Sequence, residues 1–400
     1  MNSILSDRIN NMEESATLAM AKTARELKSK GIDIISLSLG EPDFKTPVHI
    51  QEAAKAAVDE GKWFAYPPVA GYQDLREAIA SKLRDVNHIS EAKAENIVLS
   101  TGAKHSIANI FMCLLNEGDE VVIFSPYWVS YAEIIKLAGG VPVLIEGNLE
   151  NNFKATAEQL KDALTDKTKA IIYSSPCNPT GSVFSKEELE AIAEVIKSRE
   201  NLFVIADEIY ELINFTGAHA SIASFPDMFK RTITVNGFSK GYAMTGWRVG
   251  YICAPVEIAK ACEKMQGQFT SGGNTIAQRA ALAAISGDHG PSTVMADAYL
   301  RRRDLVLDLI RDIPGLETHI PEGAFYFFPK VSSFFGKSSG KHTINNADDL
   351  CLFLLDEAHV SLVTGAAFGA PDCVRLSYAA SEDELKEALK RIKKALSQLK

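Results

Sequence analysis

A lysine that follows a short strand pattern is the residue best suited to covalent chemistry in this sequence. Lys240 comes after TITV (232–235) and the turn NGFS, and small or aromatic residues flank it. A lysine that loses hydration is deprotonated more easily, so its amine becomes a nucleophile toward a carbonyl. Arg248 opens the next apolar run, where its guanidinium would suit an anion such as a phosphate. Taken alone, either residue is more often found on a surface.

Two further motifs place polar side chains at the ends of predicted buried strands. Asp207 follows LFVIA (202–206), and Asn178 lies between two prolines in SSPCNPTG (174–181). A buried carboxylate needs a cationic partner, and a protonated pyridine nitrogen would be one. The alternatives are that Asp207 caps the next helix and that Asn178 only shapes a turn.

Anion-binding chemistry is also indicated at two other places in the chain. In STGAKHSI (100–107), Gly102 would let the backbone N–H groups at a helix start approach an anion, although the P-loop pattern is missing. Arg375 in RLSYA (375–379) suits a planar carboxylate, with an ordinary surface arginine as the alternative. Each motif is weak evidence alone. The evidence lies in their order along the chain, which is TGAK, PYW, NPTG, DEIY, SK, GWR and RLSY.

The predicted helices and strands that position these motifs are those of an α/β protein. Helical patterns alternate with apolar, largely β-branched runs, which predicts strands buried on both faces of a mostly parallel sheet. The runs are IVLS (97–100), VVIF (121–124), VPVLI (141–145), AIIY (170–173), LFVIA (202–206), TITV (232–235) and VGYIC (249–253). We expect a three-layer α/β/α large domain at 47–290, with 1–46 and 291–400 forming a smaller α+β domain.

The bulk properties exclude several classes of protein. A net charge of −9 over 400 residues argues against a nucleic-acid binder, which needs a basic surface. The six cysteines form no CxxC pair and no cluster with histidine, so we expect neither disulfides nor a metal site. The polar start MNSILSDRINNMEES and the absence of a long apolar run predict a cytoplasmic protein with no membrane segment.

The ordered motifs resemble those of the class I and II aminotransferases, which are fold-type-I pyridoxal-phosphate enzymes. The resemblance runs from SATLAM and GEPDF to RLSYA and the last helix. It is nearest to the aspartate aminotransferase subgroup common in bacteria, in YPPVAGYQDLREAI, SPYWVSY and AMTGWRVGY. It implies a ping-pong enzyme that transfers amino groups between amino acids and 2-oxo acids with pyridoxal 5′-phosphate, and aspartate with 2-oxoglutarate is the expected pair.

The resemblance also assigns a role to each motif by position. Lys240 would hold the cofactor as a Schiff base and act as base and acid, and Asp207 would keep the pyridine nitrogen protonated. Tyr210 and Asn178 would bond the phenolic oxygen, and Trp128 would stack on the ring. The residues expected around the phosphate are Gly102, Ala103, Ser239, Arg248 and, from the neighbouring subunit of a homodimer with shared active sites, Tyr66.

A dicarboxylic substrate is implied by the same resemblance. Arg375 would bind the substrate α-carboxylate, with the backbone at Gly40 closing over it. Lys104 and Thr17 stand where the resembling subgroup holds the distal carboxylate, and the arginine of the other subgroup has no counterpart in FTSGGNT (269–275). The whole substrate site is expected to comprise Gly40, Trp128, Asn178, Arg375, Lys104 and Thr17.

Other functions stay open from the sequence. Within the same family, a prephenate, aromatic or alanine aminotransferase or a β-lyase would use the same cofactor residues. A pyridoxal-phosphate-binding transcriptional regulator would also need a basic DNA-binding domain, for which the chain offers no pattern. A catalytically inactive scaffold is disfavoured by the complete set of Lys240, Asp207, Tyr210 and Arg375.

Overall fold

A seven-stranded sheet organises the larger part of the computed structural model, which describes residues 4–400. Its strands are β2 (Ile97–Ser100), β3 (Glu120–Ser125), β4 (Val141–Glu146), β5 (Thr168–Ser174), β6 (Phe203–Asp207), β7 (Thr232–Gly237) and β8 (Gly250–Cys253). They lie in the order β2-β8-β7-β6-β5-β3-β4. Only β8 runs antiparallel to its neighbours, β7 and β2. The predicted α/β class with a mostly parallel sheet is therefore confirmed.

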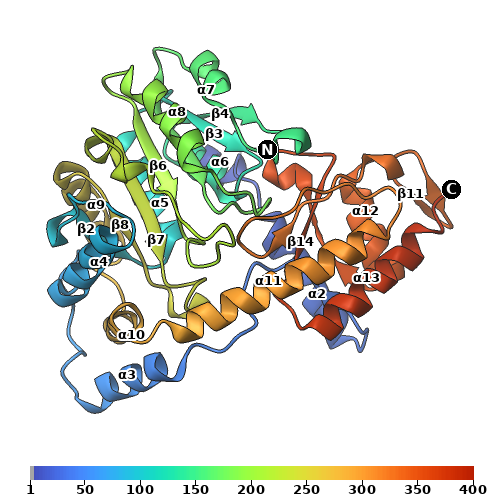
Figure 1. Ribbon diagram of the computed structural model, residues 1–400, viewed down its shortest axis with the longest axis horizontal. Coiled ribbons are helices and arrows are strands. Elements are labelled where there is room, and N and C mark those ends of the chain that lie inside the picture. The colour runs from blue at the N-terminus through green and yellow to red at the C-terminus, as the bar shows by residue number, and fades with distance from the viewer. Residues whose placement is uncertain (1–3) are drawn as a thin grey trace.

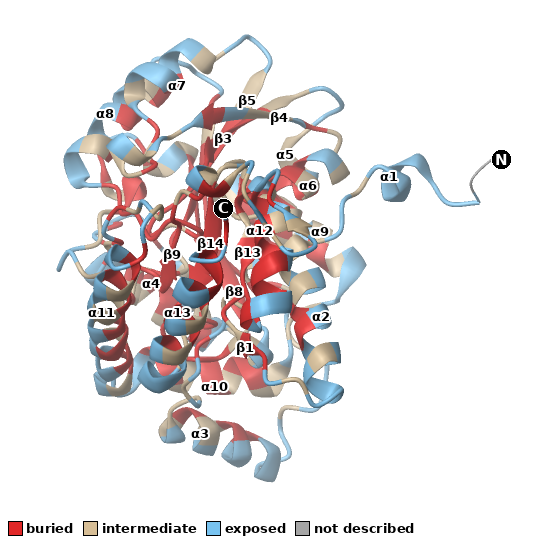
Figure 2. Cartoon of the chain, turned by 90° about the vertical axis from the view of Figure 1, so that its right-hand side faces the viewer, coloured by how far each residue is buried: buried red, intermediate tan, exposed pale blue. Residues whose placement is uncertain are grey.

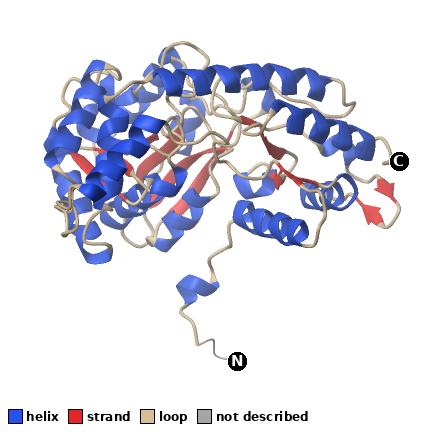
Figure 3. Ribbon diagram, turned by 90° about the horizontal axis from the view of Figure 1, so that it is seen from below, coloured by secondary structure: helices blue, strands red, loops and turns tan. Residues whose placement is uncertain are grey.

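Helices cover both faces of this sheet, as Figures 1 and 3 show. The hydrophobic clusters place α5, α6 and α9 on one face, and α4, α7, α8 and α10 on the other. The helices of this part are α3 (Val48–Asp59), α4 (Gln73–Asp85), α5 (Ala103–Leu114), α6 (Ser130–Leu137), α7 (Ala157–Ala163), α8 (Lys186–Lys197), α9 (Val256–Phe269) and α10 (Thr275–Ser286).

The apolar runs are explained by burial on two sides. Along β3, Val121 and Ile123 pack toward α5 and α6, whereas Val122 and Phe124 pack toward α8, because successive side chains of a strand point to opposite faces. The edge strand β4 is the exception, since Val141 and Leu144 are 46% and 42% exposed. The expectation of burial on both faces is therefore wrong for VPVLI, whereas β2 at the opposite edge of the sheet is buried throughout.

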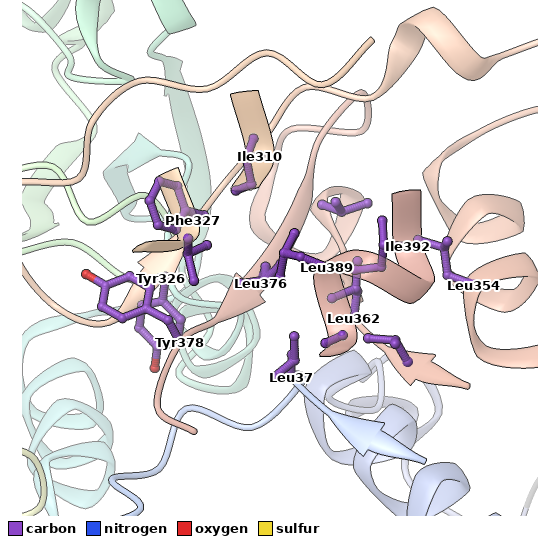
Figure 4. Packing of buried hydrophobic residues seen from close by; sticks show 14 of the residues in the cluster. Leu37, Ile310, Tyr326, Phe327, Leu354, Leu362, Leu376, Tyr378, Leu389 and Ile392 are labelled. Carbon is purple, nitrogen blue, oxygen red and sulfur yellow. The ribbon is translucent and has the colours of Figure 1, made fainter. Parts of the chain in front are cut away.

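A second, smaller assembly is built mainly from the C-terminal third of the chain. Its three-stranded sheet has the order β13-β14-β9, from β9 (Tyr326–Phe327), β13 (Val363–Thr364) and β14 (Val374–Ser377). Its helices are α12 (Ala347–Phe353), which continues as a π-helical turn at Leu354–Ala358, and α13 (Glu382–Leu396). A short hairpin joins β10 (Ser338–Ser339) to β11 (His342–Thr343). Figure 4 shows the core of this assembly, with Phe327, Leu376 and Ile392 packed together.

The start of the chain packs with this C-terminal assembly. β1 (Ile35–Ser36) pairs in parallel with β12 (Val360–Ser361), and α2 (Ala16–Ser29) lies beside them. Helix α11 (Gly290–Arg311) runs from α10 toward α13, as Figure 1 shows. The domain boundaries predicted from the sequence stay predictions, although the buried clusters separate along similar lines.

The N-terminal helix α1 (Asp7–Asn10) stands apart from the rest of the molecule. Figure 2 shows it projecting to the right of the molecule with exposed surfaces, while buried strands lie in the centre of the body. Among residues 4–400, no helix combines the length and apolarity that a membrane crossing requires.

Candidate active site

A cavity of about 280 Å³ lies where the carboxyl ends of β3, β5, β6 and β7 meet the smaller assembly. The carboxyl edge of a parallel sheet is the usual place for a ligand. Twelve of the fourteen predicted site residues line this cavity: Thr17, Gly40, Ala103, Lys104, Trp128, Asn178, Asp207, Tyr210, Ser239, Lys240, Arg248 and Arg375. Gly102 adjoins it and Tyr66 lies elsewhere.

Lys240 enters the cavity from the turn that follows β7. Its Nζ donates a hydrogen bond to the carbonyl oxygen of Gly40 and lies 5.7 Å from the ring centroid of Tyr210. Burial lowers the pKa of the Lys240 amine from 10.5 to about 8. A neutral amine is therefore accessible close to physiological pH, as nucleophilic attack on a carbonyl requires.

Asp207 is the last residue of β6 and is only 4% exposed. Its Oδ2 accepts a hydrogen bond of 2.5 Å from the Tyr131 hydroxyl, and its Oδ1 accepts one of 3.2 Å from the Ile209 N–H. Burial raises the pKa of Asp207 from 3.8 to about 6, and no cationic side chain in the described part of the chain forms an ion pair with it. The carboxylate is thus poised to receive a positively charged ring nitrogen.

Arg375 lies on β14 and is 1% exposed. Its Nη1 donates to Asn178 Oδ1 over 2.9 Å and its Nη2 donates to the Ser38 carbonyl, while its buried Nε has no partner in the described part of the chain. The Asn178 carbonyl oxygen is therefore occupied, which leaves its amide N–H groups for a ligand. A buried guanidinium with an unpaired donor fits an incoming carboxylate.

The start of α5 forms a cradle for an anion. Gly102 has φ 81°, and a Cβ added there would overlap the Arg248 guanidinium. No side chain caps the twelve-residue helix that begins at Ala103, so its first N–H groups stay open to a phosphate. Arg248 itself has φ 57°, a left-handed conformation that is unusual for a residue with a side chain. This arrangement fits the predicted phosphate group.

Lys104 and Thr17 also line the cavity. The Lys104 Nζ lies 4.8 Å from the Trp128 ring centroid, and burial together with the charge of Arg248 lowers the pKa of Lys104. The Thr17 hydroxyl is buried and makes no hydrogen bond to any of the described residues 4–400. An ammonium and an unpaired hydroxyl fit a second carboxylate of a ligand.

Sequence reasoning missed two tyrosines of the site. Tyr131 lies on α6 and is 1% exposed, and Tyr326 lies on β9 and is fully buried. The Tyr326 hydroxyl is 2.7 Å from that of Tyr210. Both tyrosines lie in apolar surroundings, in YAEII and AFYFF, where an aromatic residue reads as core. A hydroxyl within such a core segment is the only signal that could have identified them.

The turn after β6 has a second polar face, directed away from the cavity. Glu208 pairs with His219 at 3.0 Å, and Glu211 pairs with Lys82. Glu208, Glu211 and His219 lie close enough to hold a metal ion, but Lys82 already supplies the positive charge at Glu211. These pairs therefore anchor the turn that carries Asp207 and would not favour a cation.

Tyr66 is 90% exposed and does not reach the cavity of its own chain. It lies on a segment that packs against the loop between α9 and α10, where Gly272 approaches Pro67, and against the start of α10, where Thr275 donates a hydrogen bond to the Trp63 carbonyl. Its predicted contact with a neighbouring subunit stays a prediction.

Comparisons with known proteins give a consistent result. Residues 32–392 match the family described as aminotransferase class I and II. The chain is 45% identical to the aspartate aminotransferase of Geobacillus stearothermophilus, over 97% of this chain and 98% of that protein. It is also 45% identical to a Petunia hybrida bifunctional aspartate aminotransferase and glutamate/aspartate-prephenate aminotransferase, over 99% and 83%. The Thermus thermophilus aspartate aminotransferase with maleate superposes with a TM-score of 0.92 at 40% identity, over 99% and 100%.

Proposed function

The chain belongs to the aminotransferase class I and II family, and we propose that it transfers the amino group of aspartate to 2-oxoglutarate with pyridoxal 5′-phosphate as its cofactor. One observation carries the assignment. The amine of Lys240 shares a cavity with the buried carboxylate of Asp207, which forms no ion pair within residues 4–400, and with the buried guanidinium of Arg375. These groups supply a nucleophile, a partner for a pyridinium and a receptor for an α-carboxylate.

The proposed cofactor site uses the sequence motifs in their expected roles. Asp207 would hold the ring nitrogen in its protonated form, and Trp128 would cover the ring. The hydroxyl of Tyr210 and the free amide of Asn178 would donate to the phenolic oxygen. The proposed phosphate ligands are Gly102, Ala103, Ser239 and Arg248.

The proposed mechanism assigns the proton transfers to Lys240. Arg375 binds the α-carboxylate of the amino acid and orients its Cα proton toward the Lys240 amine. Lys240 acts as a base when it removes the Cα proton of the amino acid. It acts as an acid when it gives a proton back to Cα in the reverse half of the reaction, which converts the 2-oxo acid into an amino acid. When bound, the cofactor supplies a protonated ring that accepts the electron pair released at Cα. The segment at Gly40 closes over the substrate and excludes water.

Two carboxylates in the substrate are favoured by two of the residues that line the cavity. Lys104 and Thr17 are proposed to bind the distal carboxylate of aspartate or of 2-oxoglutarate. Prephenate also carries two carboxylates and is the second candidate, supported by the prephenate activity named for the Petunia hybrida relative. Values of kcat/KM for aspartate, glutamate, prephenate, phenylalanine and alanine separate these candidates.

A cytoplasmic homodimer completes the proposal, with Tyr66 of one subunit reaching the phosphate site of the other. The exposed rings of Phe64, Tyr66 and Phe269, which are 69%, 90% and 64% exposed, support a contact surface there. We also propose 47–290 as the large domain and 1–46 with 291–400 as the small one. Mixing inactive Lys240→Ala and Tyr66→Ala proteins would restore activity only if the subunits share their sites.

An absorbance spectrum of the purified holoenzyme tests the function directly. We expect a visible band that bleaches on addition of aspartate and returns with 2-oxoglutarate. Lys240→Ala should lose this cycle, whereas substitution of the exposed Lys186 on α8 to alanine should leave it intact. A Lys240→Ala protein that still converted aspartate at a near-normal rate would overturn the assignment.

A further inference from the structure

Tyr326 joins the two assemblies at the centre of the cavity. It comes from β9 of the smaller sheet, is fully buried, and places its hydroxyl 2.7 Å from the hydroxyl of Tyr210. Figure 4 shows its ring at one end of the core cluster, beside that of Tyr378. Tyr326 also lines the cavity, so it is more than a core residue.

The ring of Tyr326 lies against the carboxylate-binding arginine. The Arg375 guanidinium is 4.6 Å from the ring centroid, within the range of a cation–π interaction. The two residues belong to paired strands, since Ser377 of β14 is opposite Tyr326 of β9. The ring therefore fixes one side of a buried guanidinium whose Nε has no hydrogen bond.

The hydroxyl of Tyr326 lies against the backbone at Gly40, which also contacts Lys240. A Cβ added at Gly40 would overlap the Tyr326 hydroxyl, so only glycine allows this approach. The carbonyl of Gly40 accepts the hydrogen bond from the Lys240 Nζ. One side chain thus touches Tyr210, Arg375 and the backbone that Lys240 contacts.

We propose that Tyr326 is a positioning residue for the aminotransferase reaction, whose hydroxyl orients Tyr210 and whose ring orients Arg375. This inference rests on the proposed function. If Tyr326 donates its proton to the Tyr210 oxygen, the Tyr210 proton stays directed into the cavity, toward the phenolic oxygen of the cofactor. A chain of two hydrogen bonds strengthens the terminal donor, because each bond polarises the next.

Two substitutions separate the hydroxyl from the ring. Tyr326→Phe removes only the oxygen and keeps the ring against Arg375. Tyr326→Leu removes both. Tyr378→Phe is the matched control, since Tyr378 is equally buried in the same core and its hydroxyl donates to the Ala324 carbonyl outside the cavity.

Two measurements on the holoenzymes test the proposal. The first is the pH midpoint of the cofactor's visible absorption, with Tyr210→Phe as the reference for loss of the donor. We expect Tyr326→Phe and Tyr210→Phe to shift this midpoint in the same direction. The shift in Tyr326→Phe should be at least about a fifth of the shift in Tyr210→Phe. The second is the Kd of maleate, an unreactive dicarboxylate. It should stay within about twofold in Tyr326→Phe and weaken about tenfold in Tyr326→Leu.

The outcomes distinguish this inference from the proposed function. A midpoint that moves in Tyr210→Phe but not in Tyr326→Phe, or that moves equally in Tyr378→Phe, overturns the role of the hydroxyl. Wild-type affinity for maleate in Tyr326→Leu overturns the role of the ring. If Tyr210→Phe itself leaves the midpoint unchanged, or if no visible band forms, the proposed cofactor site is wrong and this inference falls with it.

Discussion

Replacing Tyr131 with phenylalanine removes the shortest hydrogen bond to Asp207 without changing the packing of the ring. The hydroxyl lies 2.5 Å from Asp207 Oδ2, and both residues are buried. A hydrogen bond to an ionised group contributes about 2 kcal/mol, and one between neutral groups about 1 kcal/mol. The substitution therefore destabilises ionised Asp207 more than protonated Asp207, and raises its pKa by about one unit.

The pH dependence of this effect follows from the direction of the pKa shift. Burial raises the pKa of Asp207 from 3.8 to about 6, so the folded state binds more protons than the unfolded state between these values. The free energy of unfolding therefore falls as the pH rises through this window, by about 3 kcal/mol in the cofactor-free protein. In Tyr131→Phe the window extends to about pH 7. We expect a loss of about 2 kcal/mol at pH 8 and about 1 kcal/mol at pH 5.

Urea unfolding of the cofactor-free protein at these two pH values measures the difference. Tyr173→Phe is the control, because Tyr173 is also a buried tyrosine of the sheet region but its hydroxyl has no hydrogen-bond partner. Its removal should not lower the free energy of unfolding, because a buried hydroxyl without a partner is unfavourable, and the change should be the same at both pH values. An equal loss at pH 5 and pH 8 in Tyr131→Phe would refute a hydrogen bond that favours the ionised carboxylate.

Three further predictions concern the cavity itself. Cofactor uptake by the cofactor-free protein, followed by stopped-flow absorbance, should accelerate with pH and level off above about pH 8, because burial lowers the pKa of the Lys240 amine and only its neutral form attacks a carbonyl. Lys104→Gln should lower kcat/KM for aspartate by about tenfold to a hundredfold and leave that for alanine nearly unchanged, and an equal loss for both would exclude a role in binding the distal carboxylate. Gly40→Ala should reduce activity at least tenfold in steady-state assays, because the added methyl overlaps the Tyr326 hydroxyl, and Gly267→Ala in α9, where the methyl meets only ordinary contacts, is the control.

The positions of the main site residues could be predicted because they follow from the periodicity of the sheet. Asp207 ends β6, Asn178 follows β5 and Lys240 follows β7, so the carboxyl ends of neighbouring parallel strands bring them together. Apolar runs identified these strands, because burial on both faces leaves few polar residues within them. The family resemblance then supplied the roles, which no spacing alone could give.

Contacts that depend on tertiary packing could not be predicted in this way. Tyr131 reaches Asp207 from α6, and Tyr326 reaches Tyr210 from a different sheet, across 116 residues of chain. In sequence, both are aromatic residues in apolar segments, which are usually core. The exposure of β4 was missed for a related reason, since nothing in VPVLI marks it as the edge of the sheet.

At position 248, whose backbone is left-handed, the residue that would favour thermal stability differs from the residue that would favour ligand binding. An arginine with φ 57° bears about 1 kcal/mol of strain that glycine would avoid, so Arg248→Gly would relax the backbone while deleting the proposed phosphate ligand. Libraries screened for thermal survival without cofactor would therefore enrich this change, and libraries screened with cofactor would reject it. Comparing the two screens would show whether cofactor binding at this position is obtained at the expense of thermal stability.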